Sequence, residues 1–317
     1  MMSCNRAIHV VALLGLLYST RTVSSFTVTI QQAQPPTSTT STSSSTALFE
    51  TQFANKVTDL FLNAPKPTQY DVMIKLTFPG ALNYDQLESR IRRITGVKGF
   101  TPENTLLATS LCCDELARTM EKDLVKVYGN NFHLGGLAGF PFAGSTGFGA
   151  MAAHIPDDGS VLLVYGPHVG VSTSGGIGKV ERRGIALLDS CCGSAIAASN
   201  YVQGITDGGA TINTKIQQFT DFQQGAVQEL LLPHGKRLAD AQDRMRELPF
   251  CLFDSQDLLM REIVQKGAGK VKNNIALLGG IQINTAPEAS DYFLPLRFDF
   301  MNNKGEVLED MLDQLTF

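Results

Sequence analysis

The sequence lacks a run of lysine and arginine interleaved with aromatic residues, and its formal net charge is only -4 over 317 residues. Proteins that bind nucleic acid usually carry such a basic patch, because it neutralises the phosphates of the backbone. We therefore do not expect nucleic acid as a partner. The hydrophobic content of 43% is that of a globular protein with a sizeable core.

Cysteine is also scarce, with six residues in the whole chain. This number is too small for a disulfide-stapled scaffold. Four of the six form the adjacent pairs Cys112-Cys113 and Cys191-Cys192, and sequence neighbours cannot readily bridge one another without strain. We therefore expect reduced thiols or metal ligands.

Nucleotide-binding motifs are absent as well. The glycine-rich stretches 135–149 and 175–178 contain neither the G-x-G-x-x-G nor the P-loop spacing, so we predict no nucleotide cofactor. Small residues in these stretches instead favour a close approach of backbone segments around a buried site.

No apolar run near the N-terminus reaches the roughly 20 residues of a membrane-spanning helix. The run Ala7–Tyr18 is shorter, and small residues follow it. Residues 1–25 therefore have the layout of a secretory signal peptide. A membrane anchor is the alternative, and we expect no stable one.

Acidic residues are missing between Phe26 and Phe49, where serine and threonine dominate. Residues 26–48 therefore resemble a plastid transit peptide, although arginine is rarer than usual. A disordered linker is the alternative. We expect one folded domain over residues 49–317.

Metal-binding side chains are concentrated between residues 111 and 195, which hold four of the six cysteines and three of the five histidines. Cys112 follows an apolar run, His168 follows a strand-like segment, and Cys192 precedes a helix-like one. Loops at strand ends are where α/β sheets hold ligands. Two thiolates and one imidazole favour zinc in a tetrahedron with an open fourth position, which indicates catalysis.

The remaining pattern predicts alternating elements of one α/β domain. We expect helices near 49–62, 87–94, 116–128, 194–201, 222–232 and 256–265, and strands near 106–111, 161–165, 275–285 and 291–300.

Several separated motifs in this chain resemble the limiting-CO2-inducible B protein family of algae, whose diatom members are also called theta-type carbonic anhydrases. These motifs are Cys112-x-Asp114-Glu115, Gly166-Pro167-His168, Gly178-Lys179-Val180-Glu181-Arg182, Cys192-Gly193, Gly280-Ile281-Gln282-Ile283-Asn284-Thr285 and Asp291-Tyr292-Phe293. The resemblance implies a β-carbonic-anhydrase-like α/β fold with a mostly parallel central sheet flanked by helices. It also implies a homodimer and the hydration of CO2 at zinc.

By position, the resemblance places the zinc ligands on Cys112, His168 and Cys192, and an aspartate beside the metal on Asp114. Cys113 or Cys191 could ligate instead of its neighbour. The arginine that pairs with Asp114 is Arg118 or Arg182.

A histidine outside the ligand set could move the released proton, because an unperturbed imidazole titrates near pH 6.5. We assign this shuttle role to His154. The alternative, for His154 as for His133, is a buried histidine with satisfied hydrogen bonds.

The function expected from these residues is a zinc-dependent carbonic anhydrase that interconverts CO2 and bicarbonate in a plastid CO2-concentrating mechanism. The signal peptide and the transit-like segment together resemble the two-part presequence of algae with secondary plastids. A catalytically inactive zinc-binding regulatory or scaffold protein of the same family is one alternative. A hydrolase using Cys112 and His168, and a cluster of inert buried thiols, are two others.

Overall fold

The computed structural model describes residues 69–208 and 220–316. The predicted signal peptide, transit-like segment and helix near 49–62 lie outside these residues. The helices are α3 (Gln69–Thr77), α4 (Tyr84–Gly96), α5 (Arg118–Tyr128), α6 (Gly144–Ala152), α7 (Gly193–Thr206), α8 (Phe222–Leu231), α9 (Gly235–Asp240), α10 (Arg244–Gly267) and α11 (Leu312–Thr316). The strands are β1 (Leu82–Asn83), β2 (Thr105–Ser110), β3 (Asn131–His133), β4 (Ser160–Tyr165), β5 (His168–Gly170), β6 (Lys179–Val180), β7 (Asp189–Ser190), β8 (Ile275–Asn284), β9 (Tyr292–Met301) and β10 (Val307–Asp310).

The central sheet has the strand order β1-β9-β8-β4-β2-β3, with β5 also paired to β8 and β10 to β9. The pairs β2–β3, β2–β4, β4–β8 and β5–β8 are parallel, whereas β9 pairs antiparallel to its neighbours. Every residue of β2, β4 and β8 is buried. Parallel strands that are covered on both faces have continuous apolar sequences, which explains why these three strands could be predicted.

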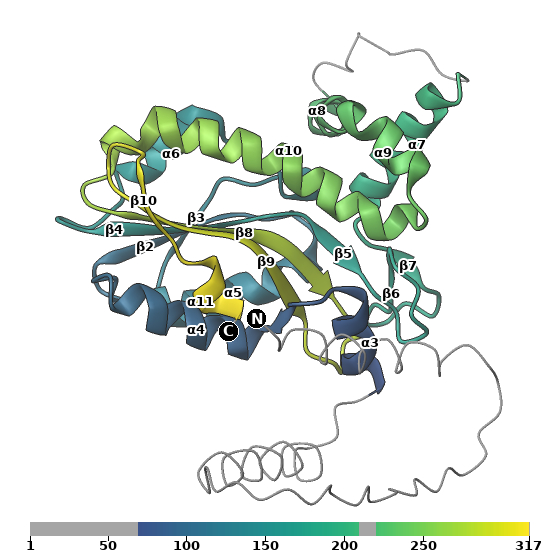
Figure 1. Cartoon of the computed structure of the whole chain (residues 1–317), viewed down its shortest axis with the longest axis horizontal. Helices are drawn as coiled ribbons and strands as arrows, with labels where there is room; N and C mark the ends of the chain where they lie inside the picture. The colour runs from purple at the N-terminus through teal and green to yellow at the C-terminus, as the bar shows by residue number, and fades with distance from the viewer. Residues whose placement is uncertain (1–68, 209–219, 317) are drawn as a thin grey trace, which may run out of the picture. The chain divides into compact units, whose positions relative to one another are not determined.

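Helices cover both faces of this sheet (Figure 1). Along β4, Val161 and Leu163 point into a core with α6 and α10, and Leu162 and Val164 point into a core with α4, α5 and α11. This alternation follows from the two-residue period of a strand. The structure is therefore the α/β fold with a mostly parallel central sheet that the sequence predicts.

A third apolar cluster lies beyond the carboxyl ends of β2 and β4. It joins α7, α8, α9 and the first turns of α10, and it includes Cys112 and Cys192. The helices of this cluster therefore form a wall behind the predicted metal ligands.

The short elements α3, α9, α11, β1, β3, β5, β6, β7 and β10 were not predicted. Two longer helices also differ from the sequence prediction. Helix α6 lies inside the glycine-rich stretch 135–149, where no helix was predicted. It forms because Phe148 and Met151 bury against the core in spite of three glycines in the helix. The helix predicted near 256–265 is the second half of the longer α10, which accommodates Pro249 in its first turns. Among the described residues, no helix is both long and apolar enough to cross a membrane.

Candidate metal centre

The fold brings Cys112, His168 and Cys192 together from three separate connections. Cys112 follows β2, His168 begins β5 directly after the turn that ends β4, and Cys192 is the residue before α7. Because β2 and β4 are parallel neighbours, their carboxyl ends meet at one edge of the sheet. All three side chains are buried, and one ligand atom of each lies within 4.8 Å of the others.

The distances within this group fit a bound metal ion. The two thiol sulfurs of Cys112 and Cys192 lie 3.9 Å apart, close to the roughly 3.8 Å expected for two thiolates on a tetrahedral zinc with bonds of about 2.3 Å. Nε2 of His168 is buried and has no hydrogen-bond partner within the described part of the chain. A buried nitrogen without a partner is costly unless something unseen binds it.

The Cys112 thiol is not activated by its protein surroundings. The neighbouring thiol of Cys192 and burial together raise the pKa of Cys112 to about 12. A cation is therefore needed to hold this residue as a thiolate at neutral pH. This argues against the hydrolase alternative, since a nucleophilic cysteine needs a lowered pKa.

The turn between β4 and β5 requires glycine. Gly166 has a φ of +153°, and a Cβ atom there would lie 1.7 Å from the carbonyl oxygen of Gly280. Gly139 packs against the same turn, where a Cβ atom would lie 2.3 Å from the carbonyl oxygen of Gly166. Only residues without a side chain allow His168 to follow β4 so closely.

Backbone hydrogen bonds fix the position of the second cysteine pair. The amide of Gly170 donates to the carbonyl of Cys191 at 2.9 Å, and the amide of Cys191 donates to the carbonyl of Gly178 at 3.1 Å. The strand that starts with His168 is thereby tied to the segment that carries Cys192.

Asp114 lies beside the ligands at the start of the short helical turn 115–117. Its carboxylate accepts two hydrogen bonds from Arg182, at 3.1 and 2.8 Å, and one from the amide of Leu116 at 3.0 Å. Burial alone would raise the pKa of Asp114, but the hydrogen bonds from Arg182 outweigh it and hold the pKa well below its usual range. Asp114 is therefore ionised.

The structure distinguishes the two arginine candidates. Arg182, on the β6–β7 hairpin, is only 10% exposed and also pairs with Glu115 and Asp189. Arg118 pairs instead with Glu121 on its own helix, at 3.6 Å. The partner of Asp114 is therefore Arg182.

The other cysteines of the two adjacent pairs, Cys113 and Cys191, differ in burial. Cys113 is exposed and belongs to no group of ligand atoms within the described residues. Cys191 is buried, with its sulfur 3.4 Å from Nδ1 of His168, and it forms a second possible group with Asp114 and His168. Both groups contain His168, but Cys191 contacts Nδ1, which Asn284 also contacts, and not the partnerless Nε2.

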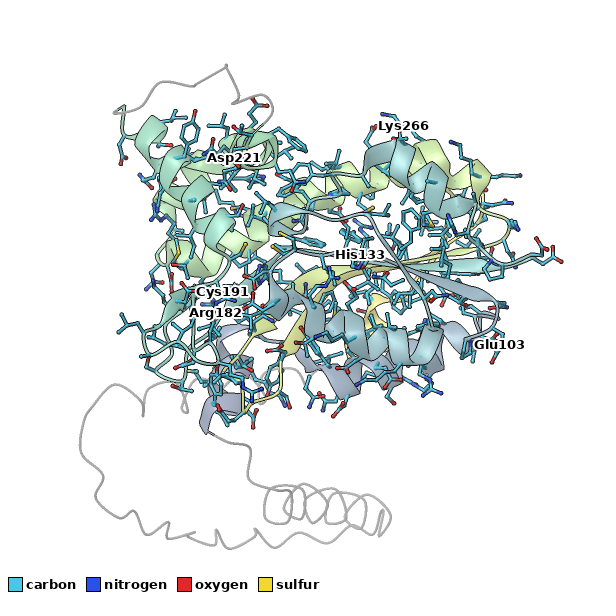
Figure 2. All side chains as sticks on the ribbon, turned by 180° about the vertical axis from the view of Figure 1, so that it is seen from behind. Glu103, His133, Arg182, Cys191, Asp221 and Lys266 are labelled. Atoms are coloured by element: carbon cyan, nitrogen blue, oxygen red, sulfur yellow. The ribbon has the colours of Figure 1, made fainter. Side chains whose placement is uncertain are left out.

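The structure does not bring His154 to this cluster. Its exposed side chain follows α6, before the amino end of β4, and its ring packs on Phe132 at 5.6 Å between centroids. His133 is paired with Glu121 at 2.8 Å and lies away from Arg182 and Cys191 (Figure 2). The shuttle role of His154 stays a prediction.

Asn284 contacts the site but had no assigned role in the sequence. Its Oδ1 lies 2.9 Å from Nδ1 of His168, and its Nδ2 donates to the carbonyl of Leu116 at 3.1 Å. The only sequence signal was its place in the motif 280–285. Its contact with His168 follows from the pairing of β5 with the end of β8.

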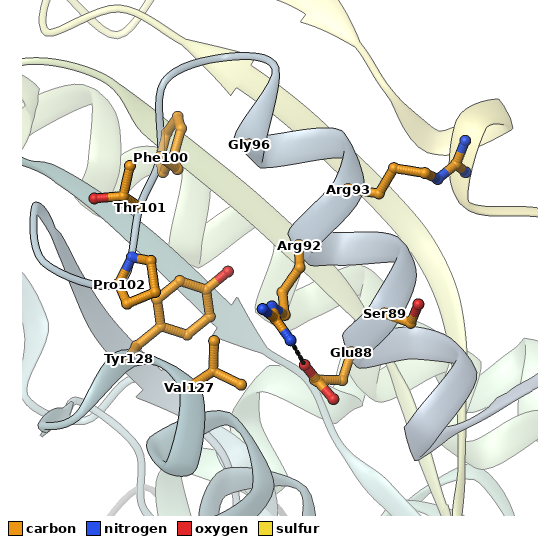
Figure 3. A pocket seen from close by; sticks show the side chains of 10 residues that line it. All are labelled: Glu88, Ser89, Arg92, Arg93, Gly96, Phe100, Thr101, Pro102, Val127 and Tyr128. Carbon is orange, nitrogen blue, oxygen red and sulfur yellow. Dashed lines mark hydrogen bonds and ion pairs between the residues drawn. The ribbon is translucent and has the colours of Figure 1, made fainter.

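Only the smaller of two cavities touches the predicted metal ligands. A cavity of about 10 Å³ touches His168 and both Cys191 and Cys192, and its other walls are mainly apolar. A larger pocket of about 480 Å³ lies between α4 and the end of α5 and is lined by Arg92, Phe100 and Tyr128 among others (Figure 3). The larger pocket contains none of the metal-binding residues.

Residues 81–302 match the model of a family described as limiting CO2-inducible proteins B/C beta carbonic anhydrases. The chain belongs to this family. The family is the one that the sequence motifs resembled.

Solved structures agree with this assignment. The structure of PtLCIB4, a homolog of the limiting CO2-inducible protein LCIB, is 44% identical, with a TM-score of 0.71 over 75% of this chain and 98% of that one. A variant of PtLCIB4 gives 42% identity and a TM-score of 0.72 over 77% and 98%. LCIB itself is 18% identical with a TM-score of 0.57 over 72% and 93%, and shares the fold. A comparison with curated proteins found no match.

Proposed function

We propose that this protein is a zinc-dependent carbonic anhydrase that interconverts CO2 and bicarbonate. The observation that carries the proposal is the buried group of Cys112, His168 and Cys192 with the ionised Asp114 beside it. Membership of a family described as beta carbonic anhydrases supports the same reaction.

The three residues would hold zinc through two sulfurs and one ring nitrogen, leaving a fourth position open. When bound, the ion supplies Lewis acidity that brings the ionisation of a water molecule close to neutral pH. All other steps depend on the surrounding side chains.

Asp114 acts as a hydrogen-bond acceptor only, because Arg182 keeps its carboxylate ionised. In this role it accepts a hydrogen bond from the attacking oxygen and leaves the lone pair of that oxygen directed at the carbon of CO2. Arg182 in turn prevents the carboxylate from rotating towards the metal ligands. Asp114 therefore affects turnover more than metal content.

The small cavity beside the ligands favours an uncharged substrate. Val169, Ile196 and Leu252 contribute apolar walls next to His168 and Cys192. CO2 carries no charge and loses little hydration beside such apolar walls, whereas bicarbonate loses much more.

The proton released in hydration must leave the site. We propose that it passes through solvent to the exposed imidazole of His154, which lies before the amino end of β4 and outside the cluster. The His154→Ala variant should then lose rate at low buffer concentration and regain it at high buffer. An unchanged rate at low buffer would end this assignment.

We further propose that the protein works as a homodimer in a plastid CO2-concentrating mechanism and that residues 1–48 direct it there. A fluorescent protein fused to residues 1–48 should accumulate in the plastid of an alga with secondary plastids. Light scattering on the purified chain tests the dimer.

The decisive experiment is CO2 hydration by the purified, zinc-quantified full chain, compared with the Cys192→Ala and Asp114→Ala variants. We expect fast hydration that is lost in both variants, with zinc lost only from Cys192→Ala. Retained hydration in the Cys192→Ala variant would contradict the proposal.

A second candidate function is a zinc-binding regulatory or scaffold protein without activity. The observation that favours it is the small size of the cavity, about 10 Å³, which is room for about one water molecule. Stoichiometric zinc with no hydration above the buffer rate would support this function instead.

A further inference from the structure

The side chain of Asn284 has an orientation that its hydrogen bonds determine. Its Nδ2 donates to the carbonyl oxygen of Leu116 at 3.1 Å and to Oδ2 of Asp291 at 3.3 Å. The carbonyl of Leu116 only accepts hydrogen bonds, as does Asp291 when it is ionised, so a flipped amide would place oxygen against oxygen. Oδ1 of Asn284 must therefore face His168.

This orientation decides which nitrogen of His168 carries a hydrogen. Oδ1 of Asn284 lies 2.9 Å from Nδ1 of His168 and can only accept. Nδ1 therefore bears the hydrogen, and Nε2 has the free lone pair. Nε2 is also the buried atom that lacks a partner among the described residues.

Asp291 anchors this arrangement from the far side. Its Oδ1 accepts hydrogen bonds from the amide of Thr285 at 2.7 Å and from the hydroxyl of Thr285 at 3.2 Å. The carboxylate is thus held in place before it meets Asn284. The bond from Asn284 to Leu116 also ties the amide to the turn that begins with Asp114.

We propose that Asn284, anchored by Asp291, is a positioning residue that fixes the tautomer and ring orientation of His168 so that Nε2 is presented to zinc. This inference rests on the proposed function, because it assumes that the cluster holds zinc. Partners of metal-binding histidines commonly act in this way. The competing acceptor is Cys191, whose sulfur lies 3.4 Å from Nδ1.

The first test is the dissociation constant for Zn²⁺, measured on the full chain by competition with a chromophoric chelator. Asn284→Leu should weaken binding by roughly 10- to 100-fold. Asp291→Ala should weaken it by less, because Asn284 still donates to Leu116 and still accepts from His168. Cys191→Ala should change the constant by less than about twofold if Asn284 is the acceptor. A loss on Cys191→Ala equal to that on Asn284→Leu would overturn the proposal.

A double variant separates the acceptor from general disturbance of the strand. Asn284→Asp combined with Asp291→Asn exchanges the amide and the carboxylate. It keeps an oxygen at Nδ1 of His168 and a hydrogen bond between positions 284 and 291, but it gives up the hydrogen bond to the carbonyl of Leu116. We expect its affinity for Zn²⁺ to stay within about fivefold of wild type. A loss as large as that of Asn284→Leu would contradict the acceptor role.

The second test reads the tautomer directly. Long-range ¹H–¹⁵N spectra of the zinc-loaded protein with labelled histidine should show the hydrogen of His168 on Nδ1. Nε2–H in the wild type would overturn the proposal even if Asn284→Leu failed to fold.

The two proposals fail differently. If the wild type binds no Zn²⁺, both the proposed function and the role of Asn284 are wrong. If the wild type binds Zn²⁺ and Asn284→Leu, folded by circular dichroism, binds it equally well, only the role of Asn284 falls.

Discussion

Arg182 meets the carboxylate of Asp114 with two parallel hydrogen bonds, a geometry that a lysine cannot reproduce. Arg182→Lys keeps the positive charge but cannot form both hydrogen bonds, so the carboxylate of Asp114 becomes free to rotate. We expect kcat/KM for CO2 hydration to fall by roughly 10- to 100-fold at unchanged zinc content.

Arg118→Lys is the matched control, because Arg118 pairs only with Glu121 among the ion pairs of the described residues. Its kcat/KM should equal that of the wild type. Equal losses in the two variants would show that the assignment of Arg182 is wrong.

Asp291 predicts a dependence of stability on pH. Burial raises its pKa to about 6, in spite of hydrogen bonds from Thr285 and Asn284 that favour the ionised form. The folded state therefore holds this proton to higher pH than the unfolded state. The resulting stability is present below pH about 4 and is lost as pH rises through about 6, a difference of about 3 kcal/mol.

Asp291→Asn removes this titration and serves as the comparison. Thermal unfolding of the metal-free wild type and variant between pH 5 and pH 7.5 should show the wild type losing stability relative to the variant as pH rises. A constant difference across this range would refute the raised pKa.

The thiols outside the ligand set should differ in reactivity. Cys113 is exposed, whereas Cys251 is buried and burial raises its pKa to about 11. Thiolate is the reactive form, so iodoacetamide at pH 8 should label Cys113 before Cys251. Peptide mapping by mass spectrometry of the folded protein measures this, and early labelling of Cys251 would contradict it.

At the scale of elements, the turn between β4 and β5 controls where His168 stands. Gly166→Ala would place a methyl group against the backbone of Gly280 and is expected to destabilise the fold by at least about 3 kcal/mol. Gly96→Ala is the control, since nothing lies within 4 Å of a Cβ atom there and alanine favours the end of α4 by up to about 1 kcal/mol. Chemical denaturation of both variants compares them, and a Gly166→Ala protein as stable as the wild type would contradict the argument.

The sequence predicts the parallel strands β2, β4 and β8 because burial on both faces leaves a continuous apolar run. It does not predict β3 and β5, which have three residues each. It predicts Cys112, His168 and Cys192 as neighbours because strand ends converge. It does not predict α6, since Gly144, Gly147 and Gly149 oppose helix formation and only packing of Phe148 overrides them.

Contacts between side chains that are far apart in the sequence could not be predicted either. Arg118 is close to Asp114 in the chain, but its position on α5 directs it to Glu121, and Arg182 arrives from a hairpin 68 residues away. Asn284 is 116 residues from His168. Neither contact has a local pattern, because each depends on how β5, β6 and β8 are arranged.

At the scale of the whole molecule, the metal is expected to stabilise the fold, because its ligands come from three connections of the sheet. Ligand binding to the native state alone adds about 2.7 kcal/mol at a hundredfold excess over Kd. Chelation should therefore lower Tm by roughly 5 to 10 °C for a chain of this size. Cys112→Ala should show no further drop with chelator, and an equal drop in that variant would place the stabilising metal elsewhere.

The surroundings of Arg182 also bear on the direction in which the reaction runs most easily. Asp114, Glu115 and Asp189 share this one guanidinium, and Lys179 bonds to Ser190 on the same hairpin. Three carboxylates against two cations leave one negative charge in excess. An anion formed next to them is repelled, and a neutral gas molecule is not. If the protein catalyses the proposed reaction, bicarbonate departs quickly, and a higher concentration of it is needed to drive dehydration at half its maximal rate.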